Sequence, residues 1–115
     1  MTLTKEQALE YHRWMWYDMR EDLGDCPGYS DRMIYKHKWC REKFPREDIL
    51  VDCFLCEYAF QTKGNCSGCP INWGGSGVYC QRPFDAEGGI DWRTSAISEI
   101  LALPEKEEIN VDNGM

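Results

Sequence analysis

Residues 53–69 of the 115-residue chain read CFLCEYAFQTKGNCSGC and hold four of its seven cysteines. They contain two Cys-x2-Cys pairs, Cys53 with Cys56 and Cys66 with Cys69, separated by nine residues. Two residues between thiolates let a tight turn point both sulfurs at one ion, and two such turns supply the four ligands of a tetrahedral zinc site. The spacing therefore predicts structural zinc as the cofactor.

Cys80 leaves the fourth ligand open, because it lies eleven residues beyond Cys69 and is able to replace Cys66 or Cys69. A second metal site is a further hypothesis. Its ligands would come from Cys26, Cys80 and a helical pair three residues apart, His37 and Cys40. The alternative for that pair is a hydrogen-bonded core histidine beside a small buried thiol. A redox-active Cys-x-x-C motif is less favoured, since it would need a strand-to-helix setting. An iron–sulfur cluster also ranks below zinc.

The composition is that of one small globular domain, with 43% hydrophobic and 29% charged residues. Seven cysteines are an odd number, and the first residues show no charged-then-apolar leader, so a secreted disulfide framework is not expected. No apolar run approaches the roughly 18 residues of a membrane span. The expected location is therefore the cytoplasm, with no membrane partner.

Periodicity predicts a mostly α-helical fold with helices at about 5–23, 30–44 and 92–103. Between the second and third helices, residues 49–82 form a zinc-bound, loop-rich segment with a short β-hairpin and a strand at 49–51. The domain is expected to span 1–104, followed by a polar tail at 105–115.

Capping signals set the ends of the first two helices. Thr4 and Gln7 form a capping-box pattern before the first helix, and Gly24 stands where it should stop. The second helix is expected to begin after Ser30 and to end before Pro45. Its apolar stripe is predicted from spacings of three and four, at Met33, His37, Cys40 and Phe44.

The net charge of −7 is uneven along the chain, since residues 83–115 hold eight acidic and two basic side chains. A basic stretch with interleaved aromatic residues precedes this acidic end. Basic residues among aromatic ones are able to follow a phosphate backbone, although a solvated helix face is the plainer interpretation. The candidate nucleic-acid or partner residues are Arg32, Lys36, Lys38, Trp39, Arg41, Lys43 and Arg46.

Catalytic interpretations are not favoured by the motifs. The His-x-Glu and Pro-Cys-x-x-Cys pair of zinc deaminases is missing, as is the His-Glu-x-x-His of metalloproteases. A zinc ion closed by four cysteines also has no open position for water or substrate. The expectation is a protein that is not an enzyme.

Four stretches carry a resemblance to a known group: residues 8–16, 53–59, 66–74 and 100–104. Together they resemble the small zinc-knuckle proteins of phages and prophages of Gram-positive bacteria. Size and acidity are also similar to those of anti-CRISPR proteins that block type II Cas9. Ran-binding-protein zinc fingers have a similar spacing but carry a tryptophan before the first cysteine, where this chain has Asp52.

The resemblance implies a phage-type protein that works in the bacterial host cell as an inhibitor of a defence nuclease, with Cas9 as the expected partner. It would act by interfering with DNA binding or cleavage. Two alternatives stay open from the residues themselves: a zinc-stabilised module that binds DNA directly, and a structural or scaffold protein of a phage complex.

Overall fold

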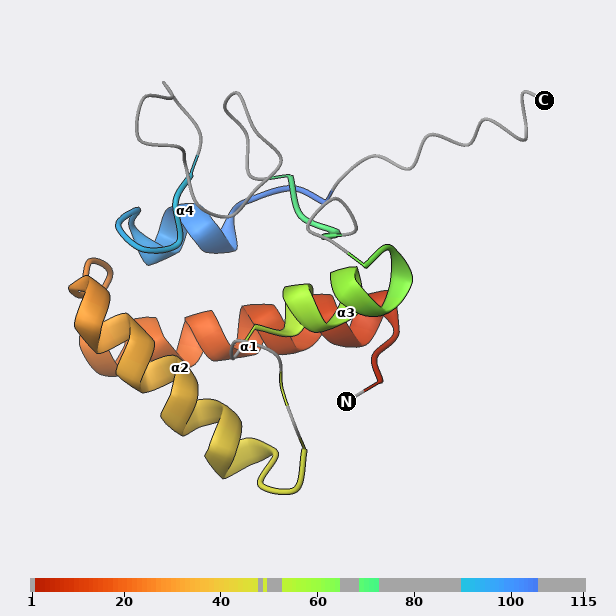
Figure 1. Cartoon of the computed structure of the whole chain (residues 1–115). Coiled ribbons are helices and arrows are strands. Elements are labelled where there is room, and N and C mark those ends of the chain that lie inside the picture. The colour runs from red at the N-terminus through yellow and green to blue at the C-terminus, as the bar shows by residue number, and fades with distance from the viewer. Residues whose placement is uncertain (1, 48, 50–52, 65–68, 73–89, 106–115) are drawn as a thin grey trace.

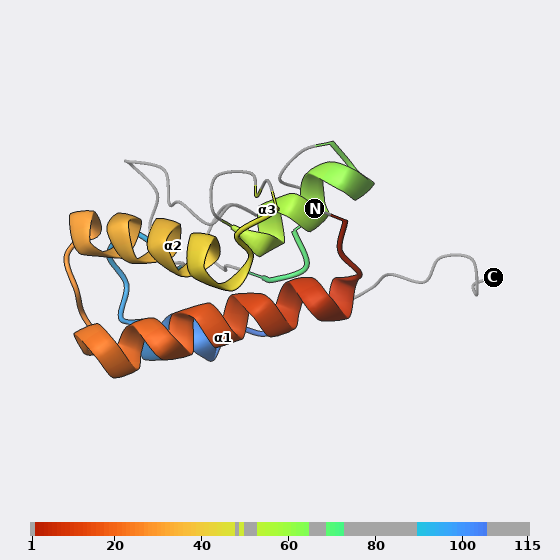
Figure 2. The ribbon, with the colours of Figure 1, turned by 90° about the horizontal axis from the view of Figure 1, so that it is seen from below.

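The computed structural model describes residues 2–47, 49, 53–64, 69–72 and 90–105. Within these residues the chain forms a small, mostly α-helical domain with four helices (Figure 1). They are α1 (Lys5–Leu23), α2 (Tyr29–Lys43), α3 (Phe54–Thr62) and α4 (Ile97–Leu101). The long helix α1 packs against each of the other three (Figures 1 and 2). None of these helices combines the length and apolar composition that crossing a bilayer requires.

Helix α1 confirms the predicted bounds and caps. The Gln7 backbone N–H donates to Thr4 Oγ1 at 3.1 Å, and the Thr4 N–H donates to Gln7 Oε1 at 3.0 Å. At the other end, Gly24 has φ +87°, a conformation that costs glycine little, and its N–H donates to the Arg20 carbonyl. The backbone groups at both ends of α1 thus find hydrogen-bond partners within the helix or next to it.

The core lies along the buried side of α1 and gathers apolar side chains from all four helices. Figure 2 shows α2 and α3 on one side of α1, with the α4 segment behind it. The buried apolar residues are Leu3, Ala8, Leu9, Met15, Trp16, Met19, Trp39, Cys40, Ile49, Phe54, Leu55, Ala59, Cys69, Ile71, Trp92, Ile97 and Ile100.

Helix α2 differs from the expected one in its cap and in its buried face. It begins at Tyr29 with Gly28 as N-cap, so the expected Ser30 cap is wrong. The expected apolar stripe is wrong at Met33 and His37, which face solvent, whereas Cys40 is buried and Phe44 packs against the core as expected. Its buried residues are Arg32, Lys36, Trp39 and Cys40.

Helix α3 was not predicted, because the region was expected to be a loop. The helix begins directly after Cys53, and Phe54, Leu55 and Ala59 fix it to the core. Gln61 then ties its last turn to the N-terminal segment, since its side chain exchanges hydrogen bonds with the backbone N–H and carbonyl of Leu3. A helix of only nine residues is marginal on its own, so its apolar contacts with α1 are what stabilise it.

The predicted helix at 92–103 is shortened to Ile97–Leu101. A hydrogen-bonded turn precedes it, in which the N–H groups of Thr94 and Ser95 donate to the Asp91 carbonyl. Ile97 and Ile100 are buried as expected.

The described residues contain no extended strand, only an isolated antiparallel bridge between Ile71 and Glu105. Most of the predicted strand at 49–51 lies outside the described residues, as does half of the segment 49–82. Of the expected tail, the described part is Glu105, which also forms ion pairs with Lys5 at 3.6 Å and Arg13 at 3.7 Å.

Candidate metal centre

Cys53 and Cys56 meet at the N-terminus of α3. Cys53 is the N-cap residue, and the Cys56 side chain and the nearby backbone N–H groups of Cys56 and Leu55 favour its thiolate form. The Cys56 hydrogen bond is the largest cause that lowers the pKa of the Cys53 thiol to about 6, and the charge of Lys36 adds to it against the effect of burial. A thiolate held by backbone N–H groups is the donor that a zinc knuckle requires.

The other predicted ligands are divided between described and undescribed parts of the chain. Cys69 is described and buried, whereas Cys66 and Cys80 lie outside the described residues. Within the described residues, no three cysteine, histidine, aspartate or glutamate side chains lie close enough to hold one metal ion. The described pair therefore fits half of a four-thiolate zinc site, and the predicted zinc site remains a prediction.

Three of the four ligands predicted for the second metal site are described, and the structure does not bring these three together. Cys40 lies on the buried side of α2, whereas Cys26 and His37 face solvent. The three-residue spacing of His37 and Cys40 places them near the edge of the buried face, so that one side chain points inward and the other outward. The structure thus corrects the expectation that they share a face.

Arg32 is the first of three basic-stretch residues that the structure places in the interior. Its side chain is 1% exposed and donates to three backbone carbonyls: Nε to Pro27 at 2.9 Å, and Nη1 to Trp92 at 2.9 Å and Ser95 at 2.6 Å. Burial lowers the pKa of its guanidinium, although nearby Cys26, Asp25 and Asp91 act in the opposite direction. Arg32 therefore joins α2 to the turn before α4 and is not available to a phosphate.

Lys36 and Trp39 are the other two. The Lys36 ammonium lies 3.9 Å from the centre of the Trp92 ring and 5.8 Å from that of Trp16, which replaces part of its hydration by cation–π contact. The Trp39 indole Nε1–H donates to Asp18 Oδ2 at 2.8 Å. The burial of Lys36 could not be predicted from the sequence, because its aromatic partner Trp92 is far away in the chain.

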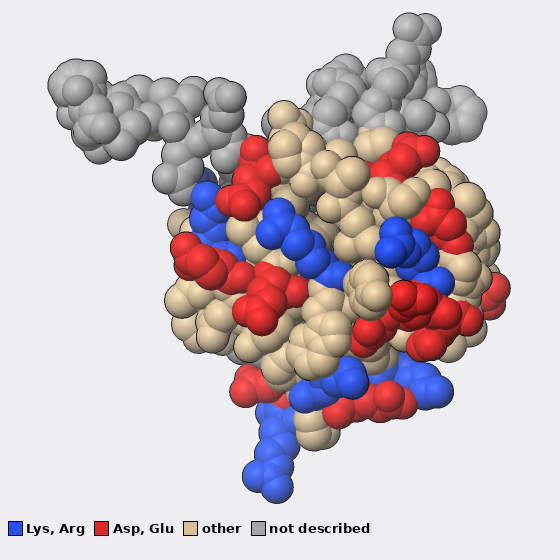
Figure 3. Space-filling model, turned by 180° about the vertical axis from the view of Figure 1, so that it is seen from behind, with Lys and Arg blue, Asp and Glu red and all other residues tan. Residues whose placement is uncertain are grey.

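The remaining residues of the basic stretch are exposed, and two of them have neighbours on their own surface. Lys38 pairs with Glu42 at 3.8 Å, and Lys43 lies 5.3 Å from the centre of the Trp14 ring. Arg41 and Arg46 complete the exposed set. On the face that Figure 3 shows, acidic and basic side chains alternate, so no continuous basic patch covers it.

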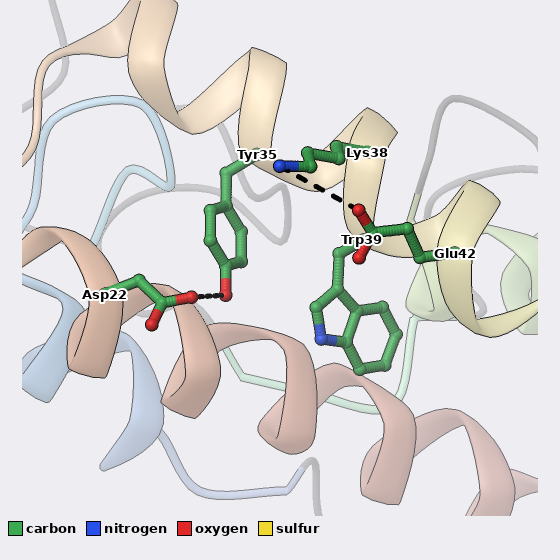
Figure 4. Close-up of a pocket in the computed structure, with 5 residues that line it drawn as sticks. All are labelled: Asp22, Tyr35, Lys38, Trp39 and Glu42. Atoms are coloured by element: carbon green, nitrogen blue, oxygen red, sulfur yellow. Dashed lines mark hydrogen bonds and ion pairs between the residues drawn. The ribbon is translucent and has the colours of Figure 1, made fainter.

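A pocket between α1 and α2 was not predicted from the sequence. It has a volume of about 80 Å³ and is lined by Asp22 from α1 and by Tyr35, Lys38, Trp39 and Glu42 from α2. Figure 4 shows the rings of Tyr35 and Trp39 side by side, both pointing from α2 toward α1. The signal that could have found it is the four-residue spacing of these two aromatic residues on one helix.

No family model, no curated protein and no solved structure matches this chain.

Proposed function

We propose that this protein is a zinc-stabilised, non-catalytic binding protein that inhibits a bacterial defence nuclease, with type II Cas9 as the target. The zinc ion would be held by Cys53 and Cys56 together with two of Cys66, Cys69 and Cys80. Four thiolates around one zinc leave no coordination position for a substrate, so the metal would have a structural role.

The observation that carries this proposal is the surface charge. Burial removes Arg32 and Lys36 from the surface, and the described residues then present nine exposed acidic side chains against six exposed basic ones. An acidic surface repels phosphate and is complementary to a basic protein channel that normally receives nucleic acid. Inhibition would follow from occupying such a channel.

The same observation weighs against direct DNA binding, the second hypothesis from the sequence. Three of its seven candidate residues are buried, which leaves Lys38, Arg41, Lys43 and Arg46. Lys38 and Lys43 already contact a carboxylate and an aromatic ring, respectively. A scaffold role in a phage complex has no observation in its favour.

Two assays on the zinc-loaded full chain test the proposal. In a plasmid-cleavage assay with reconstituted Cas9 and guide RNA, we expect cleavage to fall as the protein is added in molar excess. In a mobility-shift assay without Cas9, we expect no retention of duplex DNA at low salt. Undiminished cleavage would overturn the proposal for this nuclease, and DNA retention that weakens steeply with salt would favour the DNA-binding module instead.

A further inference from the structure

The pocket between α1 and α2 has aromatic walls that are held in place from the opposite helix. The Tyr35 hydroxyl donates to Asp22 Oδ2 at 2.5 Å, and the Trp39 indole N–H donates to Asp18 Oδ2 at 2.8 Å. Burial and the Asp22 carboxylate raise the pKa of Tyr35 and so favour the protonated hydroxyl that donates to Asp22. Both rings are thus fixed before any ligand arrives, which lowers the entropic cost of binding.

Carboxylates make the pocket attractive to a cation. Asp22 and Glu42 line it, and Asp18 lies against the Trp39 wall. The one cation among the lining residues is Lys38, whose side chain is 72% exposed and whose Nζ is 3.8 Å from Glu42 Oε1 (Figure 4). An exposed ion pair between residues four apart on a helix contributes little to stability. A cation from a partner is therefore able to displace Lys38 at little cost.

The size and shape of the pocket favour a planar cation. A volume of about 80 Å³ is room for a few water molecules or for a guanidinium group. Guanidinium stacks on aromatic faces and pairs with carboxylates through two N–H groups, whereas the ammonium of lysine is a compact, strongly hydrated charge.

We infer that this pocket binds an arginine side chain of a basic protein partner, against the wall that Tyr35 and Trp39 form and beside the carboxylates of Asp22 and Glu42. The inference rests on the proposed function, because it supplies the contact by which an acidic protein would recognise a basic channel. It makes Lys38 an internal competitor for the site.

The direct test uses a capped pentapeptide with one arginine between glycines, and two matched peptides with lysine or citrulline in its place. Binding is followed by NMR through the indole N–H resonance of Trp39. We expect the arginine peptide to shift this resonance in a saturable way, the lysine peptide to bind less tightly, and the uncharged citrulline peptide to have no effect. No shift with arginine, or equal shifts with arginine and citrulline, would overturn the inference.

Variants with opposite expected signs sharpen the test. Glu42→Gln and Asp22→Asn should each weaken binding of the arginine peptide about tenfold, since each removes the charge from a charge-assisted hydrogen bond. Lys38→Gln should strengthen it, because it removes the competitor. The matched controls are Glu10→Gln and Lys63→Gln, which make the same charge changes on exposed residues outside the pocket and should leave the affinity unchanged. Control variants that alter binding as much as the pocket variants would overturn the inference.

The nuclease assay separates this inference from the proposed function. If the wild-type protein inhibits Cas9 and Glu42→Gln inhibits equally well, the pocket is not the docking contact and the inference fails while the function stands. If the wild-type protein inhibits nothing, the proposed function fails, and an arginine-dependent shift of Trp39 would still support an arginine pocket.

Discussion

A side-chain oxygen stabilises the first turn of α1 and of α4. The oxygen at α1 belongs to a residue next to the helix, whereas the oxygen at α4 belongs to a residue far away in the chain. In α1, Thr4 accepts from Gln7, three residues away. In α4, Asp25 accepts from the backbone N–H and the hydroxyl of Ser98, 73 residues away, at 2.7 and 2.8 Å. The 19-residue helix carries its own cap, whereas the five-residue helix depends on the connection between α1 and α2.

The dependence on distant residues extends to the neighbouring short elements. Arg32 of α2 fixes the turn before α4, and the side chain of Gln61 ties α3 to the segment before α1. Short elements in the second half of the chain are therefore held by side chains, and in our proposal by a metal ion, rather than by their own helical propensity.

The largest effect is expected from Cys53→Ser. If zinc bound by four thiolates stabilises the second half by an apparent free energy of about 10 kcal/mol, losing one ligand should unfold α3 and the residues that follow it while α1 keeps helical signal. Elemental analysis, far-UV circular dichroism and thermal unfolding measure this. Cys26→Ser, on an exposed thiol, is the control. Unchanged zinc content and stability in Cys53→Ser would contradict the prediction, and loss of a second zinc equivalent in Cys26→Ser would restore the second site.

Arg32→Met should lower the free energy of unfolding by about 3 kcal/mol or more. The change leaves the carbonyls of Pro27, Trp92 and Ser95 without their donors, and each buried group that loses its partner costs about 1–3 kcal/mol. Urea denaturation monitored by tryptophan fluorescence measures the difference. Arg46→Met, at an exposed position, should change the stability by less than about 0.5 kcal/mol. Equal effects of the two variants would show that Arg32 does not join α2 to the α4 segment.

His12 gives α1 a pH dependence of its own. Burial, with the charges of Lys36 and Arg13, lowers its pKa from 6.5 to about 3. The folded protein therefore holds a neutral imidazole where the unfolded chain binds a proton. The contribution of His12 to the free energy of unfolding is fully present above pH 6.5 and is lost as the pH falls toward 3. The slope of this loss approaches about 1.4 kcal/mol per pH unit.

Urea titrations between pH 7 and pH 4.5 measure this loss. His12→Gln should show a shallower fall of stability than the wild-type protein under the same metal conditions, because glutamine binds no proton. Parallel curves for wild type and His12→Gln would contradict the prediction.

The smallest effects compare the two caps directly. Thr4→Ala should cost about 1 kcal/mol, since it removes the N-cap side chain of α1. Asp25→Ala should destabilise α4 through the loss of its two bonds to Ser98. Hydrogen exchange should speed up at the first turn of α1 in Thr4→Ala and at α4 in Asp25→Ala. Thr2→Ala, an exposed threonine ahead of the helix, is the control. If Asp25→Ala left the exchange of α4 unchanged, the cap from 73 residues away would have no energetic role.

This contrast also explains what could be predicted of the fold. The bounds of α1 followed from its capping box, its stripe and Gly24, which are all local signals. Helix α3 was missed because the two cysteines at its start indicated a knuckle followed by loop, and its stability depends on contacts with α1. The first five residues of the predicted helix at 92–103 form a turn instead, because Asp91 and Ser95 bond to each other and Asp25 takes the Ile97 N–H.

The candidate site was predictable in one part and not in another. The pairing of Cys53 with Cys56 follows from their spacing alone. The interior positions of Arg32 and Lys36 do not, because a charged residue is buried only when distant partners surround it, here the Trp92 ring and two carbonyls of the turn before α4. The pocket behind Tyr35 requires two helices to meet, which no single segment encodes.

The buried guanidinium of Arg32 also has a consequence for the order of events in folding. Its bonds to Trp92 and Ser95 join residues 60 and 63 positions apart, so the chain must close a long loop before either bond forms. Contacts of such high sequence separation are slow to form, whereas α1 is able to form from local contacts. If these bonds form after the transition state, Arg32 acts as a latch on the finished domain: its replacement would speed unfolding and leave the folding rate nearly unchanged.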